Sequence, residues 1–125
     1  VFYNFNCELV ELQAACNDLE RPYSMVNGSV KDLTAYEQES NSVTLVQYQA
    51  GAKGLNLQKA NKMIYFSLPE SVDNWMQSIK RIRRIGQTVP CFYYLLICMD
   101  SFEEKIKYCL DRGVDYNDAL FEDVP

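Results

Sequence analysis

The sequence contains no histidine, and this absence excludes several kinds of active site. Catalysis by a histidine base or a Cys/His pair is ruled out, and no zinc site with a histidine ligand can form. The five cysteines include no CxxC pair, so we interpret them as reduced, mostly buried thiols. No apolar run approaches the ~20 residues of a membrane span, and no basic-then-apolar leader is visible. These absences predict a cytoplasmic protein that does not contact a membrane.

Charge is distributed unevenly along the 125 residues. The net charge is −5, yet residues 53–84 hold seven Lys or Arg against two acidic residues, and both flanks are acidic. Affinity for nucleic acid scales with the cations presented to phosphates, so an acidic chain is a poor general binder of nucleic acid. A basic strip in an acidic body instead indicates a focused phosphate site.

Strand and helix patterns alternate along the chain, and the length predicts one domain. Strands are expected at 1–5, 23–26, 43–47, 62–67 and 91–98, and helices at 6–19, 30–39, 71–84 and 101–113. Ser71 is a plausible N-cap, and Ser101 with Glu104 forms a capping-box pattern. Apolar strands without strict alternation predict an α/β fold whose mostly parallel sheet is covered by helices on both faces.

Three polar side chains of the expected 71–84 helix fall on one stripe. Gln77, Arg81 and Arg84 occupy positions i, i+4 and i+7, within about 60° of one another around the helix. Apolar side chains fall on the opposite side, at Val72, Trp75, Met76, Ile79 and Ile82. The helix would therefore be anchored by one face and present donors to an anion on the other. The plainer interpretation is a solvated polar face.

The loop at 50–57 follows the expected 43–47 strand. Gly51 and Gly54 allow positive φ and close backbone approach, so the loop amides could hold a phosphate. Ligands of parallel sheets bind at the carboxyl ends of strands, and we expect this loop and the arginine helix to lie there. By itself, the Gly-x-x-Gly spacing is more often a plain turn.

Four motifs in this order resemble those of superfamily-two helicases of the Swi/Snf type. Residues 46–58 resemble motif V, and Gln77-x-x-x-Arg81-x-x-Arg84-x-Gly86-Gln87 resembles motif VI. Residues 1–5 are similar to the motif IV strand, and residues 101–106 resemble the helix that follows in the family.

The resemblance runs from residue 1 to about residue 113 and implies a second, C-terminal RecA-like lobe. RecA-like lobes are three-layer domains, with helices on both faces of a parallel sheet. The remaining residues, 114–125, would form an acidic tail. The compact 20–45 stretch is more similar to phage and bacterial members of the group than to eukaryotic ones.

The resemblance also implies a missing partner. In this family ATP binds between two lobes, and the first lobe supplies the phosphate loop G-x-x-x-x-G-K-[ST] and the carboxylates that hold Mg²⁺. Neither motif occurs in this sequence. ATP and Mg²⁺ would therefore be bound mainly by a first, N-terminal RecA-like lobe elsewhere in a longer parent chain, DNA would be the other partner, and the isolated fragment should be inactive.

Site roles follow from the same resemblance. Arg81 and Arg84 would act as arginine fingers, with Gln77 positioning a phosphate oxygen or a partner between the lobes. Gly54 and Asn56 would lie near the nucleotide.

On the DNA side, Ala50 and Gly51 would lie near the backbone. The family usually has Ser-Thr just upstream, where this chain has Gln47-Tyr48. Gln49 and Lys53 are therefore the candidates for a contact with DNA phosphate.

Two alternatives remain. The chain could be a degenerate, non-catalytic lobe that docks DNA or protein, although the intact Arg81/Arg84 pair argues against this. It could be an independent nucleotide-binding protein, which the missing phosphate loop disfavours. Separately, Phe92-Tyr93-Tyr94 could stack on bases, but its place in the apolar run 91–98 favours a core strand.

Overall fold

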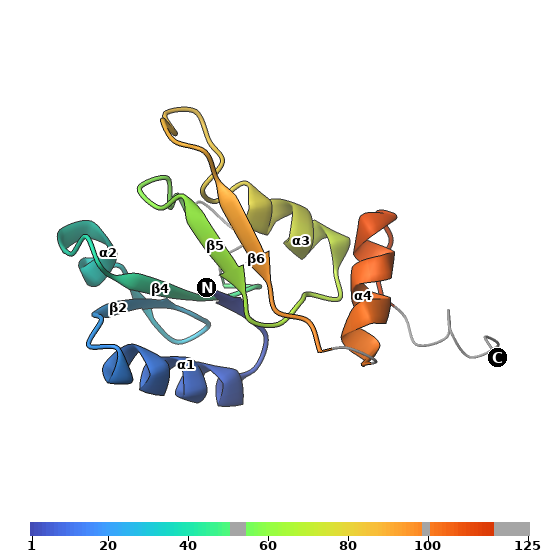
Figure 1. Ribbon diagram of the computed structural model, residues 1–125, viewed down its shortest axis with the longest axis horizontal. Helices are drawn as coiled ribbons and strands as arrows, with labels where there is room; N and C mark the ends of the chain where they lie inside the picture. Colours follow the sequence, from blue (N-terminus) through green and yellow to red (C-terminus); the bar gives the residue numbers. More distant parts are fainter. Residues whose placement is uncertain (51–54, 99–100, 117–125) are drawn as a thin grey trace.

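Parallel pairing dominates the sheet of the computed structural model, which describes residues 1–50, 55–98 and 101–116 (Figure 1). The elements in chain order are β1 Phe2–Tyr3, α1 Asn6–Asp18, β2 Tyr23–Val26, β3 Lys31–Asp32, α2 Thr34–Gln38, β4 Val43–Gln47, β5 Lys62–Tyr65, α3 Val72–Ile79, β6 Phe92–Leu95 and α4 Phe102–Asp111. The strand order is β3-β2-β4-β1-β5-β6, and only β2 and β3 pair antiparallel. The predicted α/β fold with a mostly parallel sheet is confirmed.

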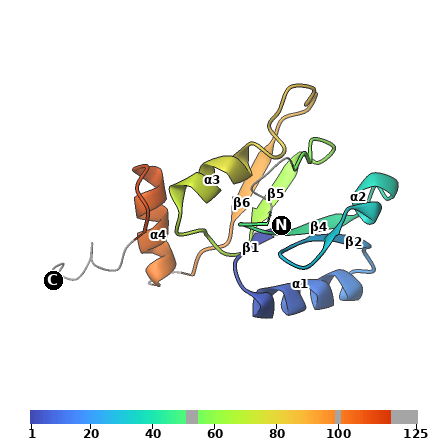
Figure 2. The same cartoon turned by 180° about the vertical axis from the view of Figure 1, so that it is seen from behind.

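The central strand β1 separates two apolar clusters, because its two residues point to opposite faces of the sheet. On one face Tyr3 and Leu45 pack with Cys16 of α1. On the other face Phe2 joins a larger cluster that is covered by α3, α4 and the segment between β4 and β5. Figures 1 and 2 show α1 on one side of the sheet and α3 on the other. The two faces are thus covered by different parts of the chain.

Serine side chains cap two helices as the sequence predicts, but among the described residues Glu104 does not complete the predicted capping box at Ser101. Ser71 Oγ accepts a hydrogen bond from Asn74 N at 3.3 Å, and Ser101 Oγ accepts one from Glu103 N at 3.2 Å. The start of α3 has a further partner, because Asp115 Oδ1 accepts from Val72 N at 2.8 Å. The first residues of the predicted acidic tail therefore pack back onto the lobe, whereas residues 117–125 lie outside the described residues.

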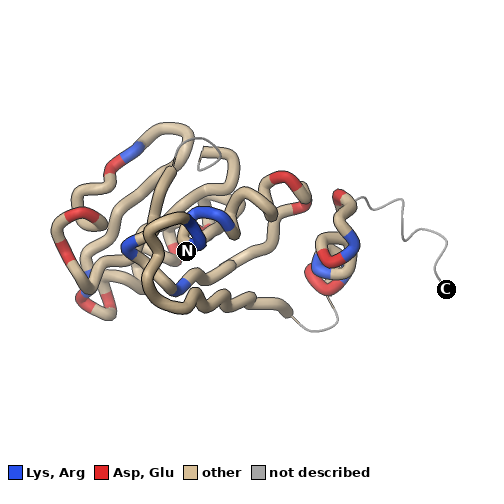
Figure 3. The backbone as a smooth tube through the Cα atoms, turned by 90° about the horizontal axis from the view of Figure 1, so that it is seen from above, with Lys and Arg blue, Asp and Glu red and all other residues tan. Residues whose placement is uncertain are grey.

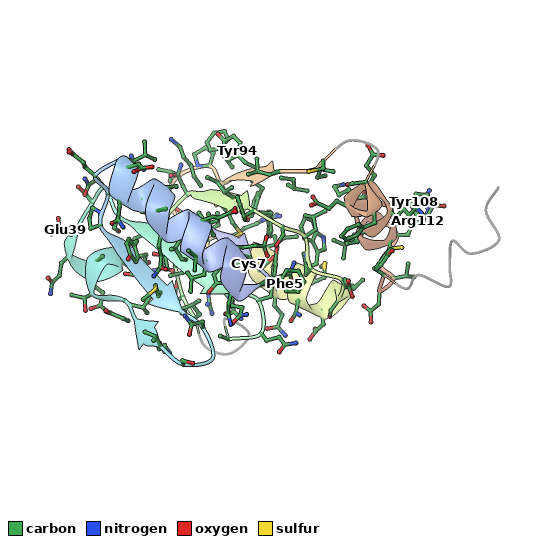
Figure 4. The ribbon with its side chains drawn as sticks, turned by 90° about the horizontal axis from the view of Figure 1, so that it is seen from below. Phe5, Cys7, Glu39, Tyr94, Tyr108 and Arg112 are labelled. Carbon is green, nitrogen blue, oxygen red and sulfur yellow. The ribbon has the colours of Figure 1, made fainter. Side chains whose placement is uncertain are left out.

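The predicted helix at 30–39 and the predicted core strand at 91–98 are confirmed only in part. The first segment forms the short strand β3 and the five-residue helix α2 instead of one helix. The second forms β6 at the edge of the sheet, where alternate residues face the core. Tyr93 packs against the larger cluster, but Phe92 and Tyr94 are 48% and 49% exposed. Figure 4 shows Tyr94 on the same side of the sheet as α1 but beyond the edge of this helix, where the helix does not cover the sheet.

The prediction of reduced, mostly buried cysteines is confirmed only in part. All five cysteines are free, as predicted, but Cys7 and Cys98 are exposed, and only Cys16 and Cys109 are buried. Within the described ranges, no helix is long and apolar enough to cross a membrane. The cytoplasmic location stays a prediction.

We expect the core to depend on Leu45, which is fully buried in β4. Leu45→Ala should lower the free energy of unfolding by about 2–5 kcal/mol, through lost burial and the cavity that remains. Urea denaturation followed by circular dichroism measures this. The matched control is Leu19→Ala, because Leu19 is 70% exposed. Equal losses in the two variants would contradict the core described here.

Candidate functional site

The helix that carries Gln77 ends earlier than the sequence predicts. α3 stops at Ile79, and Arg81 and Arg84 lie in the turns that follow it. At its end Lys80 N and Arg81 N donate to Gln77 O and Ser78 O, at 3.2 and 3.1 Å, so the last turn tightens. Beyond the helix, Arg81 O accepts a tertiary bond from Leu57 N at 2.9 Å. Met76, expected on the buried stripe, is 48% exposed, whereas Ile82 is buried. The two arginines are therefore placed by contacts with residues 55–60 and not by the helix alone.

The carbonyl oxygen of Leu55 holds both arginines. Arg81 Nη1 and Arg84 Nη1 each donate to Leu55 O at 3.0 Å. A carbonyl has two lone pairs and can accept both bonds, but it carries no charge to neutralise two guanidinium groups. Among the described residues the only ion pair is Lys107–Asp111 on α4. The positive charge of the arginine pair is thus left without a carboxylate partner in this part of the chain.

Arg81 is the buried member of the pair, with only 6% of its surface exposed. Its Nη2 donates to Gln77 Oε1 at 3.3 Å, and Gln77 Nε2 donates in turn to Asp73 Oδ2 at 3.3 Å. Among the described residues, the buried Nε of Arg81 has no hydrogen-bond partner. An unpaired buried donor is costly, so the position of Arg81 is not explained by internal hydrogen bonds to the described residues alone.

The environment of Arg81 lowers its pKa below the usual value, mainly through burial and then through the positive charge of Arg84. Both causes disfavour the charged form, and a bound anion would reverse the second. Arg84 differs because its side chain is exposed beyond its bond to Leu55. The sequence treats the two arginines alike, whereas the structure gives them different surroundings.

An open cavity of about 1040 Å³ lies against these side chains. Its lining includes four cations and one acid, namely Lys80, Arg81, Arg83, Arg84 and Asp73, with Gln77, Asn56 and Gln58 among the polar residues. Figure 3 shows Lys and Arg gathered where the chain turns after α3. A predominantly cationic hollow of this size suits a phosphate-bearing ligand.

Asn56 is brought to this cavity together with Gln77, Arg81 and Arg84. It is exposed, and its Oδ1 accepts from Gln58 N at 3.1 Å. Four of the sequence-predicted site residues thus share one cavity.

The cavity does not lie at the carboxyl ends of the strands, where we expected it. The turn after α3 is bonded to residues 55–60, which lead to the amino end of β5. Asn61 Nδ2 donates to Pro90 O at 3.1 Å, which ties the approaches to β5 and β6 together. Figures 1 and 2 show these two approaches side by side. Tyr48, whose Oη donates to Ser67 O, lies at the carboxyl edge.

Gln87 is a residue of the site to which the sequence assigned no role. Its Nε2 lies 3.0, 2.9 and 2.8 Å from the carbonyl oxygens of Gln58, Ala60 and Ile82. The signal was present in the sequence, since Gln87 closes the motif that resembles motif VI. The three carbonyl groups that accept from Gln87 could not be predicted from the sequence, because they come from two segments that lie apart along the chain.

The predicted DNA-contacting residues are only partly described. Gln49 is exposed just after β4, and Ala50 packs against the larger apolar cluster. Gly51, Lys53 and Gly54 lie outside the described residues. Their predicted roles remain predictions.

Comparisons with known proteins agree on the family. The family described as "Helicase conserved C-terminal domain" matches residues 7–86. The chain is 30% identical over 113 residues to the fruit-fly "Transcriptional regulator ATRX homolog" and covers 8% of it, with 83% of this chain aligned. It is 28% identical over 130 residues to "ATP-dependent helicase fft1" of fission yeast, with 98% of this chain and 14% of the relative aligned.

A solved structure supports the same fold. The C-terminal part of the Fun30 ATPase domain matches 97% of this chain and 40% of its own length, with a TM-score of 0.78 and 24% sequence identity. The relatives named here are eukaryotic, so the expected likeness to phage and bacterial members stays a prediction. The chain spans only a small part of the curated relatives that it matches. It belongs to the helicase conserved C-terminal domain family, as a second RecA-like lobe of the Swi/Snf type.

Proposed function

We propose that this chain is the C-terminal lobe of an ATP-dependent DNA helicase or translocase and supplies arginines to a nucleotide bound mainly by a first lobe. The observation that carries the proposal is the arginine pair on Leu55 O, which has no carboxylate partner among the described residues. The positive charge of Arg81 and Arg84, which no carboxylate neutralises there, is available to stabilise the negative charge that builds on a transferring phosphoryl group.

The two arginines would have separate tasks. Arg84, exposed at the cavity, would reach the γ-phosphate of ATP when the lobes close. Arg81, held by Leu55 O and Gln77, would stay in place and add fixed positive charge beside the phosphates. Asn56 would contact the nucleotide from the neighbouring segment. ATP, with Mg²⁺ held mainly by the first lobe, would supply the phosphoryl group that is transferred to water.

DNA would bind on the carboxyl side of β4. Gln49 is exposed at that point, directly before the predicted contacts Ala50, Gly51 and Lys53. Because residues 49–54 lead directly to Leu55, a DNA contact there would be close in sequence to the carbonyl that holds both arginines. Gly54 would allow the chain to pass closely between the two sites.

The competing function is a non-catalytic lobe that docks DNA or protein. An exposed arginine is compatible with docking, but a buried arginine with an unpaired Nε gives a docking surface no benefit. Catalysis therefore explains the pair better, and the experiments below separate the two functions.

The isolated 125-residue chain should fold but should not hydrolyse ATP, since it has no phosphate loop. A magnesium-dependent assay of released phosphate on purified chain, with the parent protein as the positive control, measures this. Turnover by the chain alone would show that one lobe suffices and would overturn the proposal.

Replacement of Arg84 should separate chemistry from binding in the parent protein. Arg84→Ala should lower DNA-stimulated turnover by about 10³-fold or more, the scale of a lost arginine finger, with little change in ATP affinity. Steady-state kinetics and nucleotide titration measure both. Arg112→Ala is a matched control, because Arg112 stacks on Tyr108 of α4, away from the cavity (Figure 4). Normal turnover of Arg84→Ala with weakened DNA or partner binding would favour docking.

Arg81→Ala should differ by also destabilising the fold. The change leaves a void and removes a donor to Leu55 O and Gln77, which should cost about 1–3 kcal/mol in the free energy of unfolding. Thermal and urea denaturation of the two arginine variants measure the contrast. Equal stability of Arg81→Ala and Arg84→Ala would contradict the buried position of Arg81.

Lys53→Ala and Gln49→Ala test the DNA side of the proposal. Loss of one phosphate contact should weaken duplex binding similarly for all sequences and, for the lysine, reduce the log–log salt slope by about one contact. Basal turnover without DNA should stay near wild type. Titration with a fluorescent duplex at several salt concentrations measures the slope. An unchanged slope for Lys53→Ala would assign the contact to Gln49 or to backbone amides.

A further inference from the structure

The turn that carries Arg84 has little apolar packing to hold it. Residues 83–86 are all exposed, and Ile85 is 100% exposed, so the turn buries no hydrophobic side chain. Ile82, directly before it, is buried. The position of Arg84 must therefore depend on hydrogen bonds at the two ends of the turn.

Backbone geometry defines this turn. Gln87 N donates to Arg84 O at 3.0 Å, which closes a four-residue turn with Arg84 first and Gln87 last. The third residue, Gly86, has φ +98°, a conformation that side chains of L-residues rarely adopt and that type II turns require at this position. Arg84 and Gln87 are thus the two fixed ends of one local unit.

The Gln87 side chain anchors the second end. Its amide nitrogen faces the carbonyl oxygens of Gln58, Ala60 and Ile82, three acceptors that require a donor. This arrangement also determines the orientation of the amide, since its oxygen would be repelled at that point. The opposite end is held by the bond of Arg84 itself to Leu55 O. One glutamine therefore ties the turn to the segment before β5 and to Ile82 at once.

We propose that Gln87 is a positioning residue for Arg84. Its side-chain hydrogen bonds hold the turn 84–87 against residues 58–60, an arrangement that we call the clasp, and so keep the Arg84 guanidinium at the cavity. The effect on turnover rests on the proposed function of Arg84, whereas the clasp itself does not. Gln87 does not line the cavity, so it acts on a ligand only through the turn. A misplacement of about 1 Å at a reacting group can cost about 10²-fold in rate.

The clasp is tested first by backbone NMR on the 125-residue chain. Gln87→Ala should lower the amide order parameters of Ile85 and Gly86 from about 0.85, typical of rigid backbone, to below about 0.6. Gln87→Met, which keeps the length of the side chain but has no donor, should do the same and serves if the alanine variant folds poorly. Gln38→Ala is the matched control, because Gln38 is exposed at the end of α2. Order parameters unchanged in both Gln87 variants would overturn the proposal.

The catalytic consequence is tested in the parent protein. Gln87→Ala should lower kcat about 10²-fold, on the scale of such a misplacement, with KM for ATP within about threefold of wild type. Arg84→Ala combined with Gln87→Ala should be no slower than Arg84→Ala alone, because both changes remove the same interaction. Losses that multiply would assign Gln87 a role independent of Arg84 and overturn the proposal. Normal turnover of Arg84→Ala would refute the proposed function instead, and the order parameters would still decide the clasp.

Discussion

The carbonyl group of Leu55 is the interaction on which the functional surface depends. It accepts from Arg81 and Arg84, which come from the turns after α3, and it belongs to the segment that crosses from β4 to β5. Two cations converge on one neutral acceptor, so the bonds determine position without cancelling charge. A carboxylate at the same point would hold the arginines more strongly but would also neutralise them. The lobe thus keeps positive charge in a fixed place and leaves it available.

The two arginines that share this contact have different surroundings. Arg81 is buried and linked through Gln77 to Asp73, and its lowered pKa reflects burial beside another cation. Arg84 remains exposed at the cavity, on a turn held by hydrogen bonds and not by apolar packing. A rigid arginine beside an accessible one is suited to a site that is completed by a second lobe.

The sheet explains why this surface is well supported. β1 has only two residues, yet it is paired with β4 on one side and β5 on the other, and its side chains enter both apolar clusters. The segment 55–60 is anchored to this core by Leu55 and Leu57, both buried. The cavity residues are therefore attached to the larger apolar cluster. The edge strand β6 is less covered, because its side chains Phe92 and Tyr94 are about half exposed.

The sequence by itself determined the α/β class, the bounds of β2 and β4, and the serine caps of α3 and α4. It also singled out Gln77, Arg81, Arg84 and Asn56, which line one cavity. These follow from local patterns: apolar periodicity, capping side chains and motif spacing. Only the tertiary structure decided that α3 ends at Ile79, and that Arg81 is buried and Arg84 exposed. It also decided that the Gln87 side chain bonds to Gln58, Ala60 and Ile82 beside the turn that carries Arg84. The bonds of Arg81, Arg84 and Gln87 use carbonyl groups of residues 55–60, about thirty positions away along the chain. Periodicity within one helix carries no information about acceptors that a distant segment brings to its end.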